Sequence, residues 1–521
     1  MKILIADSIE KEGIDLLKKN AHTVDIFLEQ TEEELVTKIP DYDALIVRSQ
    51  TKVTKKIIEA GKKLKVIGRA GIGVDNVDVP AATRKGVLVV NAPNSTVGTT
   101  AEHTIAMMMA LVRKIPFANS AVRNGEWKKN KFIGMEIRGK TVGVIGLGRI
   151  GSEVARICQR IDMNVIASDP FVSREYAQKL GVQLMSLSEV VKNSDIITIH
   201  ATLTKSNHHI LGKNEIESMK KDAFLINCAR GGLVDESALY TALKLGRLAG
   251  AALDVFEKEP PSTSPLLTLE NVIATCHIGA STKEAQKNVA LEIATAIISV
   301  FKGEAVTSAV NFPYVKSMPE IRPYISLAGE LGKMQSRLLV GYIKNVEIAY
   351  LGEVASCEVE LVTAGFLKEL LENASDEEIT LVNAPLLARE RGINILETKN
   401  KVCQLYSNLI TTSVMTENGK ILVSGTVFGK NDLRIVNIDG YHLDIKPAKT
   451  ILLTFHQDKP GMVAHVADIL AEEKINIGEM QVGREKIGGK AIMAITLDNQ
   501  LSVSAIEKIS NIKGIIKVYQ V

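Results

Sequence analysis

The fold is decided by the stretch Thr141-Val142-Gly143-Val144-Ile145-Gly146-Leu147-Gly148-Arg149-Ile150-Gly151. Its first five residues are largely β-branched and apolar, which favours a buried strand, and residues 152–160 have the composition of a helix. A G-x-G-x-x-G pattern is weak evidence alone, but between a strand and a helix it is typical of a dinucleotide-binding turn. We therefore predict a Rossmann-type parallel sheet around this turn.

Each glycine of the turn has a separate task. Gly146 permits the tight turn, Gly148 lets the backbone approach a pyrophosphate, and Gly151 lets the helix pack close to the strand. Phosphates would bind the free N–H groups at the start of that helix. Asp169 ends the next predicted strand, where its carboxylate would accept hydrogen bonds from ribose hydroxyls and repel a 2′-phosphate. The predicted cofactor is therefore NAD; the alternative is a structural glycine turn followed by a surface acid.

The chain around this turn repeats a strand-and-helix rhythm. Short apolar runs alternate with charged stretches in residues 1–92, and stronger runs do so in residues 141–279. Such alternation is typical of parallel sheets covered by helices. Residues 99–113, rich in Ala and Met, predict a long helix that bridges the two units, and residues 283–301 predict another that returns to the first.

The C-terminal half has a different pattern. After Asn311-Phe312-Pro313, residues 326–340 look helical and residues 358–362 and 421–426 look like strands, which predicts an α+β domain. Residues 450–521 read strand, helix, strand, strand, helix, strand, the ferredoxin-like plan of a small regulatory module.

The predicted fold class is α/β. We expect two doubly wound parallel-sheet domains of Rossmann or flavodoxin-like type, then an α+β intervening domain and a ferredoxin-like domain. The expected boundaries are residues 1–95 with 285–310, 96–284, 311–447 and 448–521.

Composition excludes several classes of protein. A chain of 521 residues is too long for one core, and 46% hydrophobic with 24% charged residues is ordinary for a globular protein. The first seven residues read as a strand rather than a secretory signal, and no apolar run suggests a membrane partner. A net charge of +3, spread along the chain, argues against nucleic acid. Five scattered cysteines fit a reducing cytoplasm and no metal site.

Three polar side chains follow successive predicted strands: Arg230, Glu259 and His277. The carboxyl ends of parallel strands meet at one edge of a sheet, where ligands bind. Oxidation of a secondary alcohol needs a base for the hydroxyl proton, and His277 is the predicted base. A carboxylate that orients this base is predicted at Glu259. A cation that binds a substrate carboxylate is predicted at Arg230. Each residue alone also has a non-catalytic explanation. His277 could be a structural histidine, Glu259 a solvated loop acid, and Arg230 a cap of a neighbouring helix. Together, beside an NAD turn, they indicate catalysis.

The sequence closely resembles the D-3-phosphoglycerate dehydrogenases, a branch of the D-isomer-specific 2-hydroxyacid dehydrogenase family. The resemblance covers the first 310 residues almost continuously, in long strings at residues 47–49, 68–78, 146–151, 227–236, 251–261 and 277–286. It implies oxidation of 3-phospho-D-glycerate to 3-phosphohydroxypyruvate with NAD, the first committed step of L-serine biosynthesis. It also implies that the first domain binds substrate and that residues 96–284 bind NAD.

The resemblance implies contacts residue by residue. It gives Arg230, Glu259 and His277 as the catalytic set, in agreement with the argument above. It gives as cofactor contacts Gly146, Gly148, Arg149, Ile150, Gly151, Asp169, Ala201, Cys228, Asp254, Gly279 and Ala280, with Ile72 near the nicotinamide. It gives as substrate contacts Arg48, Ser49, Arg69, Gly71 and Lys129, and it places Trp127 and Lys129 near a neighbouring subunit's active site. For the lysines at 128, 129 and 131 the alternative is a solvated face.

The C-terminal half resembles the long form of this family, which carries an intervening domain of the allosteric substrate-binding type and an ACT domain. There His456, Asp458 and Asn476 would form a site for an L-serine effector, although Asp458 stands where some members have Asn. The alternative is a turn that only starts a helix at Gly461, in a domain that serves assembly. The long form also implies a homotetramer, built as a dimer of dimers.

Two other functions remain open from the sequence. One is a dehydrogenase of another 2-hydroxy acid, such as glycerate, glycolate or 2-hydroxyglutarate. The other is an NAD(H)-sensing binding protein without chemistry, which the presence of Arg230, Glu259 and His277 disfavours.

Overall fold

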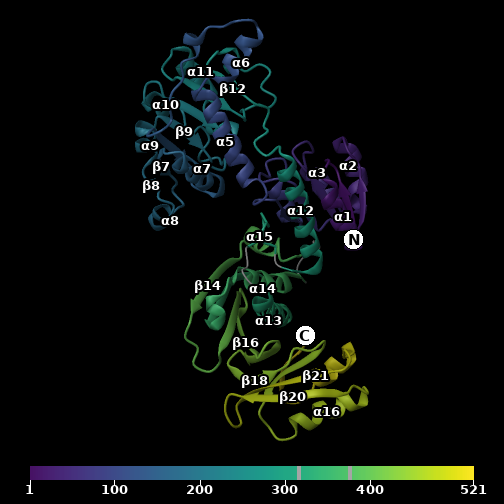
Figure 1. Cartoon of the computed structure of the whole chain (residues 1–521). Coiled ribbons are helices and arrows are strands. Elements are labelled where there is room, and N and C mark those ends of the chain that lie inside the picture. The colour runs from purple at the N-terminus through teal and green to yellow at the C-terminus, as the bar shows by residue number, and fades with distance from the viewer. Residues whose placement is uncertain (305, 314–317, 373–377) are drawn as a thin grey trace. The chain divides into compact units, whose positions relative to one another are not determined.

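The computed structural model describes residues 1–304, 306–313, 318–372 and 378–521 (Figure 1). Its internal contacts divide the chain into two compact units. The first unit contains Met1–Ser8, Asp15–Asn91 and Ile293–Val521, and the second contains Ile9–Ile14 and Ala92–Glu292. The predicted segments 285–310 and 311–447 include residues 305, 314–317 and 373–377, which lie outside the described residues.

The N-terminal part of the first unit is a parallel sheet with the strand order β2-β1-β3-β4-β5. This is a flavodoxin-like order, in agreement with the predicted fold class of doubly wound parallel sheets. Strand β2 lies at the edge of this sheet, is partly exposed and has no continuous apolar run that would mark it in the sequence. The elements are β1 (Lys2–Ile5), α1 (Lys11–Lys19), β2 (Thr23–Ile26), α2 (Glu32–Lys38), β3 (Ala44–Val47), α3 (Lys55–Ala60), β4 (Val66–Arg69), α4 (Val79–Arg84) and β5 (Leu88–Val90).

The second unit contains a parallel sheet with the order β12-β11-β10-β9-β6-β7-β8. The order reverses between β6 and β9, which makes this the switch point of a Rossmann sheet. The strands are β6 (Thr141–Ile145), β7 (Asn164–Ser168), β8 (Gln183–Leu184), β9 (Ile196–Ile199), β10 (Phe224–Asn227), β11 (Gly250–Leu253) and β12 (Val272–Ala274). The helices are α5 (Val97–Val112), α6 (Ile115–Arg123), α7 (Arg149–Arg160), α8 (Arg174–Lys179), α9 (Leu187–Asn193), α10 (Lys213–Ser218), α11 (Glu236–Lys244) and α12 (Lys283–Lys302), the last of which continues into the first unit.

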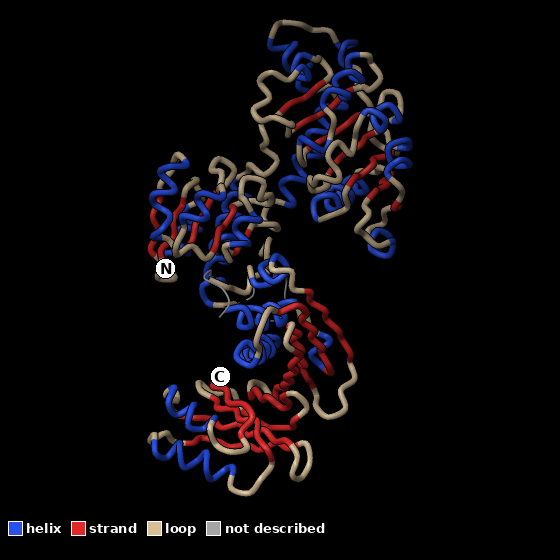
Figure 2. Tube along the Cα trace, turned by 180° about the vertical axis from the view of Figure 1, so that it is seen from behind, coloured by secondary structure: helices blue, strands red, loops and turns tan. Residues whose placement is uncertain are grey.

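Neighbouring residues of each strand in this second sheet point to opposite faces. In β10, Ile226 packs with residues of α5 and α7, and Leu225 packs with residues of α9, α10 and α11. Figure 2 shows the red strands of this unit between blue helices. Both faces of the sheet are therefore apolar and buried. Ligands can then bind only at the ends of the strands.

The C-terminal half of the chain forms two further sheets, in the orders β14-β13-β15-β16-β17-β18 and β20-β21-β19-β22. The first comprises β13 (Ile343–Gly352), β14 (Asn394–Asn400), β15 (Asn408–Thr416), β16 (Gly419–Phe428), β17 (Asp432–Ile438) and β18 (Tyr441–Ile445), with α13 (Met318–Leu338), α14 (Glu360–Glu372) and α15 (Ala384–Glu390). The second comprises β19 (Ile451–Gln457), α16 (Met462–Glu472), β20 (Ile477–Arg484), β21 (Lys490–Leu497), α17 (Val503–Ser510) and β22 (Ile515–Gln520), the predicted ferredoxin-like plan.

One predicted element in this half is wrong. Residues 358–362 were expected to form a strand, but helix α14 begins at Glu360. The short alternation of acid and apolar residues is the start of a longer helical pattern, in which Leu367, Leu370 and Leu371 are buried against the domain core. A pattern of five residues does not separate the two periods.

Among the described residues, no single helix has the length and apolar character needed to cross a membrane. The pair α5 and α6 meets that test only jointly, and the two helices are bent by 62° from one another.

The burial of β10 predicts a stability effect. Ile226 is 0% exposed, so Ile226→Ala leaves a cavity and should cost about 2–5 kcal/mol of unfolding free energy. The matched control is Leu245→Ala, because Leu245 is 77% exposed and its truncation should change stability little. Denaturant unfolding followed by circular dichroism measures both, and equal midpoints for the two variants would contradict the assigned core.

Candidate active site

The glycine turn lies at the switch point of the second sheet. Gly146 has φ 89°, and a Cβ built on it would lie 2.7 Å from the backbone nitrogen of Ala201. Only a glycine therefore fits between the end of β6 and the chain that follows β9. This contact brings together two predicted cofactor residues, Gly146 and Ala201.

The start of α7 faces outward from this turn. Its N-cap is Gly148, which offers no side-chain cap, and within the described residues nothing lies within 4 Å of a Cβ built on Gly148. The first N–H groups of the helix, at Arg149 and Ile150, thus retain the capacity to bind phosphate oxygens. Asp169 lies beside them, because its carboxylate accepts hydrogen bonds of 2.8 Å from the backbone nitrogens of Leu147 and Phe171. The turn, the open helix end and the ribose acid fit a dinucleotide.

The loop after β10 holds Arg230 at the same edge. The Asn227 side chain accepts from the nitrogen of Ala229 at 3.0 Å and donates to the carbonyl of Arg230 at 2.8 Å. A Cβ on Gly231 would lie 2.0 Å from the carbonyl carbon of Phe256, so the two backbones touch. This close approach sets the Arg230 loop beside the segment that leads to Glu259.

His277 and Glu259 form a hydrogen-bonded pair. Nδ1 of His277 lies 2.9 Å from Oε2 of Glu259, and Oε1 of Glu259 accepts from the nitrogen of Phe256 at 3.2 Å. With Nδ1–H donating to the carboxylate, Nε2 of His277 is the atom that can accept a proton from a hydroxyl. The three predicted residues therefore meet at one edge of the second sheet, in an arrangement suited to proton abstraction.

The thiol of Cys228 and the imidazole of His200 are both neutral at physiological pH. Burial, with a smaller effect from the charge of Asp254, raises the pKa of the Cys228 thiol to about 12. Burial also lowers the pKa of His200 to about 3. Cys228 is therefore a protonated thiol rather than a nucleophile, and His200 is not a second base.

Sequence reasoning missed several residues around the His277–Glu259 pair. Burial raises the pKa of Glu236, and the negative charges of Glu257 and Glu259 add to this effect. Glu257 lies 2.8 Å from Nε2 of His209. Glu236 lies within one of the quoted family strings, but no local pattern marks it as a neighbour of Glu259.

In the first unit, the predicted substrate residues lie at the carboxyl ends of β3 and β4. Val47 and Arg69 are paired in the register of these strands, so Arg48, which follows Val47, is near Arg69 in the sheet. Buried Asp7 accepts from the nitrogen of Arg48 at 2.6 Å. Asn76 donates to the carbonyl of Arg48 at 2.5 Å and accepts from Nε of Arg69 at 3.5 Å.

Gly71 has a steric reason to be glycine. Its φ is 151°, and a Cβ there would lie 1.7 Å from Nη1 of Arg69. The guanidinium of Arg69 therefore lies directly over Gly71. The next residue, Ile72, accepts from the Asn91 amide at 2.6 Å, which holds this loop at the end of the sheet.

The remaining predicted residues have these places. Trp127 is 76% exposed and Lys129 starts a short exposed 3₁₀ helix, Lys129–Phe132. In the last domain, His456 is buried in β19, and Asn476 donates to Asp498 at 3.2 Å. Asp458 accepts from the nitrogen of Gly488 at 3.0 Å and lies 3.6 Å from Arg484. The structure therefore ties Asp458 to the β20–β21 hairpin.

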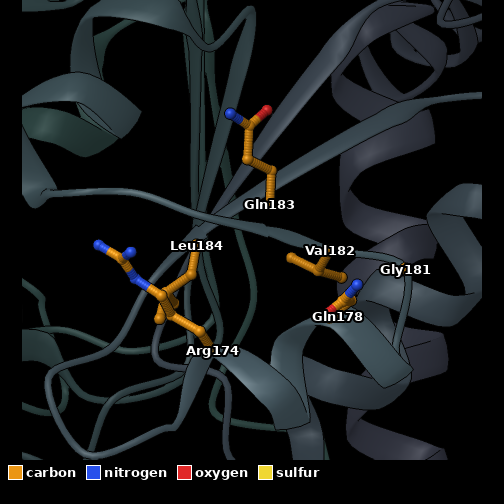
Figure 3. A pocket seen from close by; sticks show the side chains of 6 residues that line it. All are labelled: Arg174, Gln178, Gly181, Val182, Gln183 and Leu184. Atoms are coloured by element: carbon orange, nitrogen blue, oxygen red, sulfur yellow. The ribbon is translucent and has the colours of Figure 1, made fainter.

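A hollow of about 560 Å³ in the second unit is formed by other residues. It is lined by Arg174, Gln178, Gly181, Val182, Gln183 and Leu184, from α8, β8 and the turn between them (Figure 3). None of the predicted site residues is among them. Nor do the residues that the structure describes bring three or more His, Cys, Asp or Glu side chains together as a metal site would require.

Known proteins match this chain along its whole length. Residues 105–279 match the D-isomer specific 2-hydroxyacid dehydrogenase NAD binding domain, residues 320–439 the D-3-phosphoglycerate dehydrogenase intervening domain, and residues 450–514 the ACT domain. The D-3-phosphoglycerate dehydrogenase of Archaeoglobus fulgidus is 44% identical over 99% of this chain and 99% of its own.

The chain belongs to the D-3-phosphoglycerate dehydrogenase family, within the D-isomer specific 2-hydroxyacid dehydrogenases. The Bacillus subtilis D-3-phosphoglycerate dehydrogenase is 40% identical over 99% of this chain and 98% of its own. The structure of a D-lactate dehydrogenase from Aquifex aeolicus, complexed with NAD and lactic acid, has a TM-score of 0.53 and 29% identity, and covers 58% of this chain and 96% of its own. The protein is an NAD-dependent oxidoreductase, and the predicted family, fold class and cofactor are confirmed.

The His277–Glu259 pair predicts a separation of chemistry from cofactor binding. His277→Ala should lower turnover by about 10²- to 10⁴-fold, because the base is lost, with NAD affinity largely kept. Steady-state kinetics and fluorescence titration with NADH measure the two effects. Normal turnover in this variant would remove His277 from its assigned role.

Proposed function

We propose that this protein oxidises 3-phospho-D-glycerate to 3-phosphohydroxypyruvate with NAD, the first committed step of L-serine biosynthesis. The observation that carries the proposal is the His277–Glu259 pair at 2.9 Å, at the sheet edge that also holds Arg230 and the glycine turn. Relatives of 40 to 44% identity over nearly the whole chain, all D-3-phosphoglycerate dehydrogenases, support the choice of substrate.

The catalytic roles follow from the geometry of the second unit. Nε2 of His277 takes the proton of the C2 hydroxyl while the hydrogen on C2 leaves with its electron pair. NAD, when bound, accepts that hydride. Glu259 holds the imidazole through Nδ1 and stabilises the imidazolium that forms. Arg230 binds the substrate carboxylate with its planar fork and polarises the C2 oxygen.

We assign further contacts with the charged ends of the substrate to residues of the first unit. Arg69 is the last residue of β4, and Arg48, Ser49 and Gly71 lie in the loops after β3 and β4. Lys129 is assigned as an additional cation. Two guanidinium groups at the end of one sheet suit a substrate with both a phosphate and a carboxylate. The cofactor contacts that we assign are the glycine turn with Arg149 and Ile150, Asp169, Ala201, Cys228, Asp254, Ile72, Gly279 and Ala280.

We also propose the domain division and the assembly state. Residues 1–95 with 285–310 bind substrate, 96–284 bind NAD, 311–447 form the intervening domain and 448–521 the ACT domain. Exposed Trp127 and Lys129 support a homo-oligomer, a dimer of dimers, in which they approach a neighbouring subunit. Five free cysteines, with no disulfide among the described residues, support a cytoplasmic location.

We propose L-serine as the effector of the ACT domain. His456, Asp458 and Asn476 lie at the ends of β19 and before β20, and Asp458 carries a carboxylate that can accept from a serine ammonium group. Gly488 and Arg484 both meet Oδ2 of Asp458, so we assign the serine contact to Oδ1.

Substrate choice predicts a selective effect of Arg48. NADH formation at 340 nm should be much the fastest with 3-phosphoglycerate, compared with glycerate, glycolate and 2-hydroxyglutarate. Arg48→Gln should raise KM for 3-phosphoglycerate by about 10-fold or more and leave glycerate kinetics unchanged, because only the phosphate contact is lost. The matched control is Lys52→Gln, a neighbouring exposed cation. Faster turnover of another acid would replace the substrate.

Serine regulation has its own measurement. Serine added to the wild-type enzyme should lower the initial rate in a saturable way, and Asp458→Ala should abolish this response with the rate in the absence of serine kept. Absence of inhibition at millimolar serine in the wild type would assign the ACT domain to assembly instead.

A further inference from the structure

The side chain of Asp254 accepts hydrogen bonds from the loop that contains His277. This carboxylate is 1% exposed and follows β11. Its Oδ1 accepts from the nitrogen of Ile278 at 2.8 Å and from the Thr275 hydroxyl at 2.6 Å, and its Oδ2 accepts from the nitrogen of Gly279 at 2.8 Å. Its carbonyl accepts from the nitrogen of His277 at 2.9 Å. The backbone on both sides of the His277 imidazole is thus set by one buried acid.

His103 on α5 closes this cluster from the helix side. Its Nε2 lies 3.4 Å from Oδ1 of Asp254 and 3.5 Å from the hydroxyl of Thr275. A Cβ built on Gly279 would lie 3.7 Å from Cδ2 of His103, so the imidazole also packs on the loop itself. The His103 side chain is 17% exposed. These groups all lie in Ala92–Glu292, the second unit.

We propose that His103 is a positioning residue for the oxidation: through Asp254 it fixes the loop 277–279 and so holds the His277 imidazole against Glu259. His103 does not touch the substrate in this scheme. It acts on the geometry of the base, to which hydride and proton transfer are sensitive at the level of about 1 Å. The inference rests on the proposed function and assigns one more residue to the same site.

The electrostatics of Asp254 agree with this role. Burial opposes its ionisation, but the hydrogen bonds from His103, Thr275 and the nitrogens of Ile278 and Gly279 outweigh burial and hold its pKa below the usual value. The Cys228 thiol, which follows β10, also faces Asp254, and burial keeps that thiol protonated. Loss of His103 therefore raises the pKa of Asp254, so the ionised form that anchors the loop is lost at a higher pH than in the wild type.

A matched pair of amides tests the proposal in the full-length enzyme. The nitrogen of a Gln side chain can occupy the place of Nε2, whereas the shorter Asn side chain reaches only the place of Nδ1. His103→Asn should lower kcat by about 10- to 100-fold, with KM for the hydroxy acid changed far less. His103→Gln should restore most of kcat. Glu102→Gln, an exposed neighbour on α5, is the control.

The measurements separate this inference from the proposed function. All variants are compared on whichever hydroxy acid the wild type oxidises fastest, with thermal unfolding measured in parallel. Equal losses of kcat in the Asn and Gln variants, or a wild-type kcat in His103→Asn, would each overturn the positioning role. Absence of wild-type turnover on any hydroxy acid would overturn the function itself, and the positioning role with it.

Discussion

Parallel pairing of β6 with β9 is the constraint on which the second unit depends. At this pair the strand order reverses, and the backbones of Gly146 and Ala201 approach so closely that no side chain fits between them. The turn after β6 therefore opens outward, with the uncapped start of α7 and the carboxylate of Asp169 around it. Because all strands of this sheet run in one direction, β10, β11 and β12 deliver Arg230, Glu259 and His277 to the same edge.

Buried carboxylates hold the strand-end loops in both units. In the second unit, the Asp254 carboxylate accepts hydrogen bonds from the backbone nitrogens of Ile278 and Gly279. In the first unit Asp7, 4% exposed, collects the nitrogens of Arg48 and Thr51. A buried acid is stable only when its oxygens are satisfied by donors, and N–H groups of a loop supply them while fixing the loop's path. The same physics thus positions the proposed base and a proposed substrate cation.

In the ferredoxin-like domain, Asp458 is a charged acceptor at the proposed effector site. Arg484 and Gly488 of the β20–β21 hairpin already approach its carboxylate. A ligand there meets a carboxylate with a nearby cation, so its own charge matters for binding. The burial of His456 in β19 makes that residue part of the domain core as well as of the proposed site.

The sequence by itself determined the parallel-sheet fold class, the NAD turn and the ferredoxin-like plan, and it marked Arg230, Glu259 and His277 as catalytic candidates. These features depend on local periodicity and on residues that follow strands, both of which can be seen within short windows. The edge strands β2 and β8 and the start of α14 at Glu360 were decided by tertiary structure, because a short or half-exposed segment has no period of its own. The meeting of His103 with Asp254 was likewise decided by packing, since it joins α5 to a loop across 151 positions of the chain. No local pattern encodes such a contact; it arises when helix and sheet bury their apolar faces together.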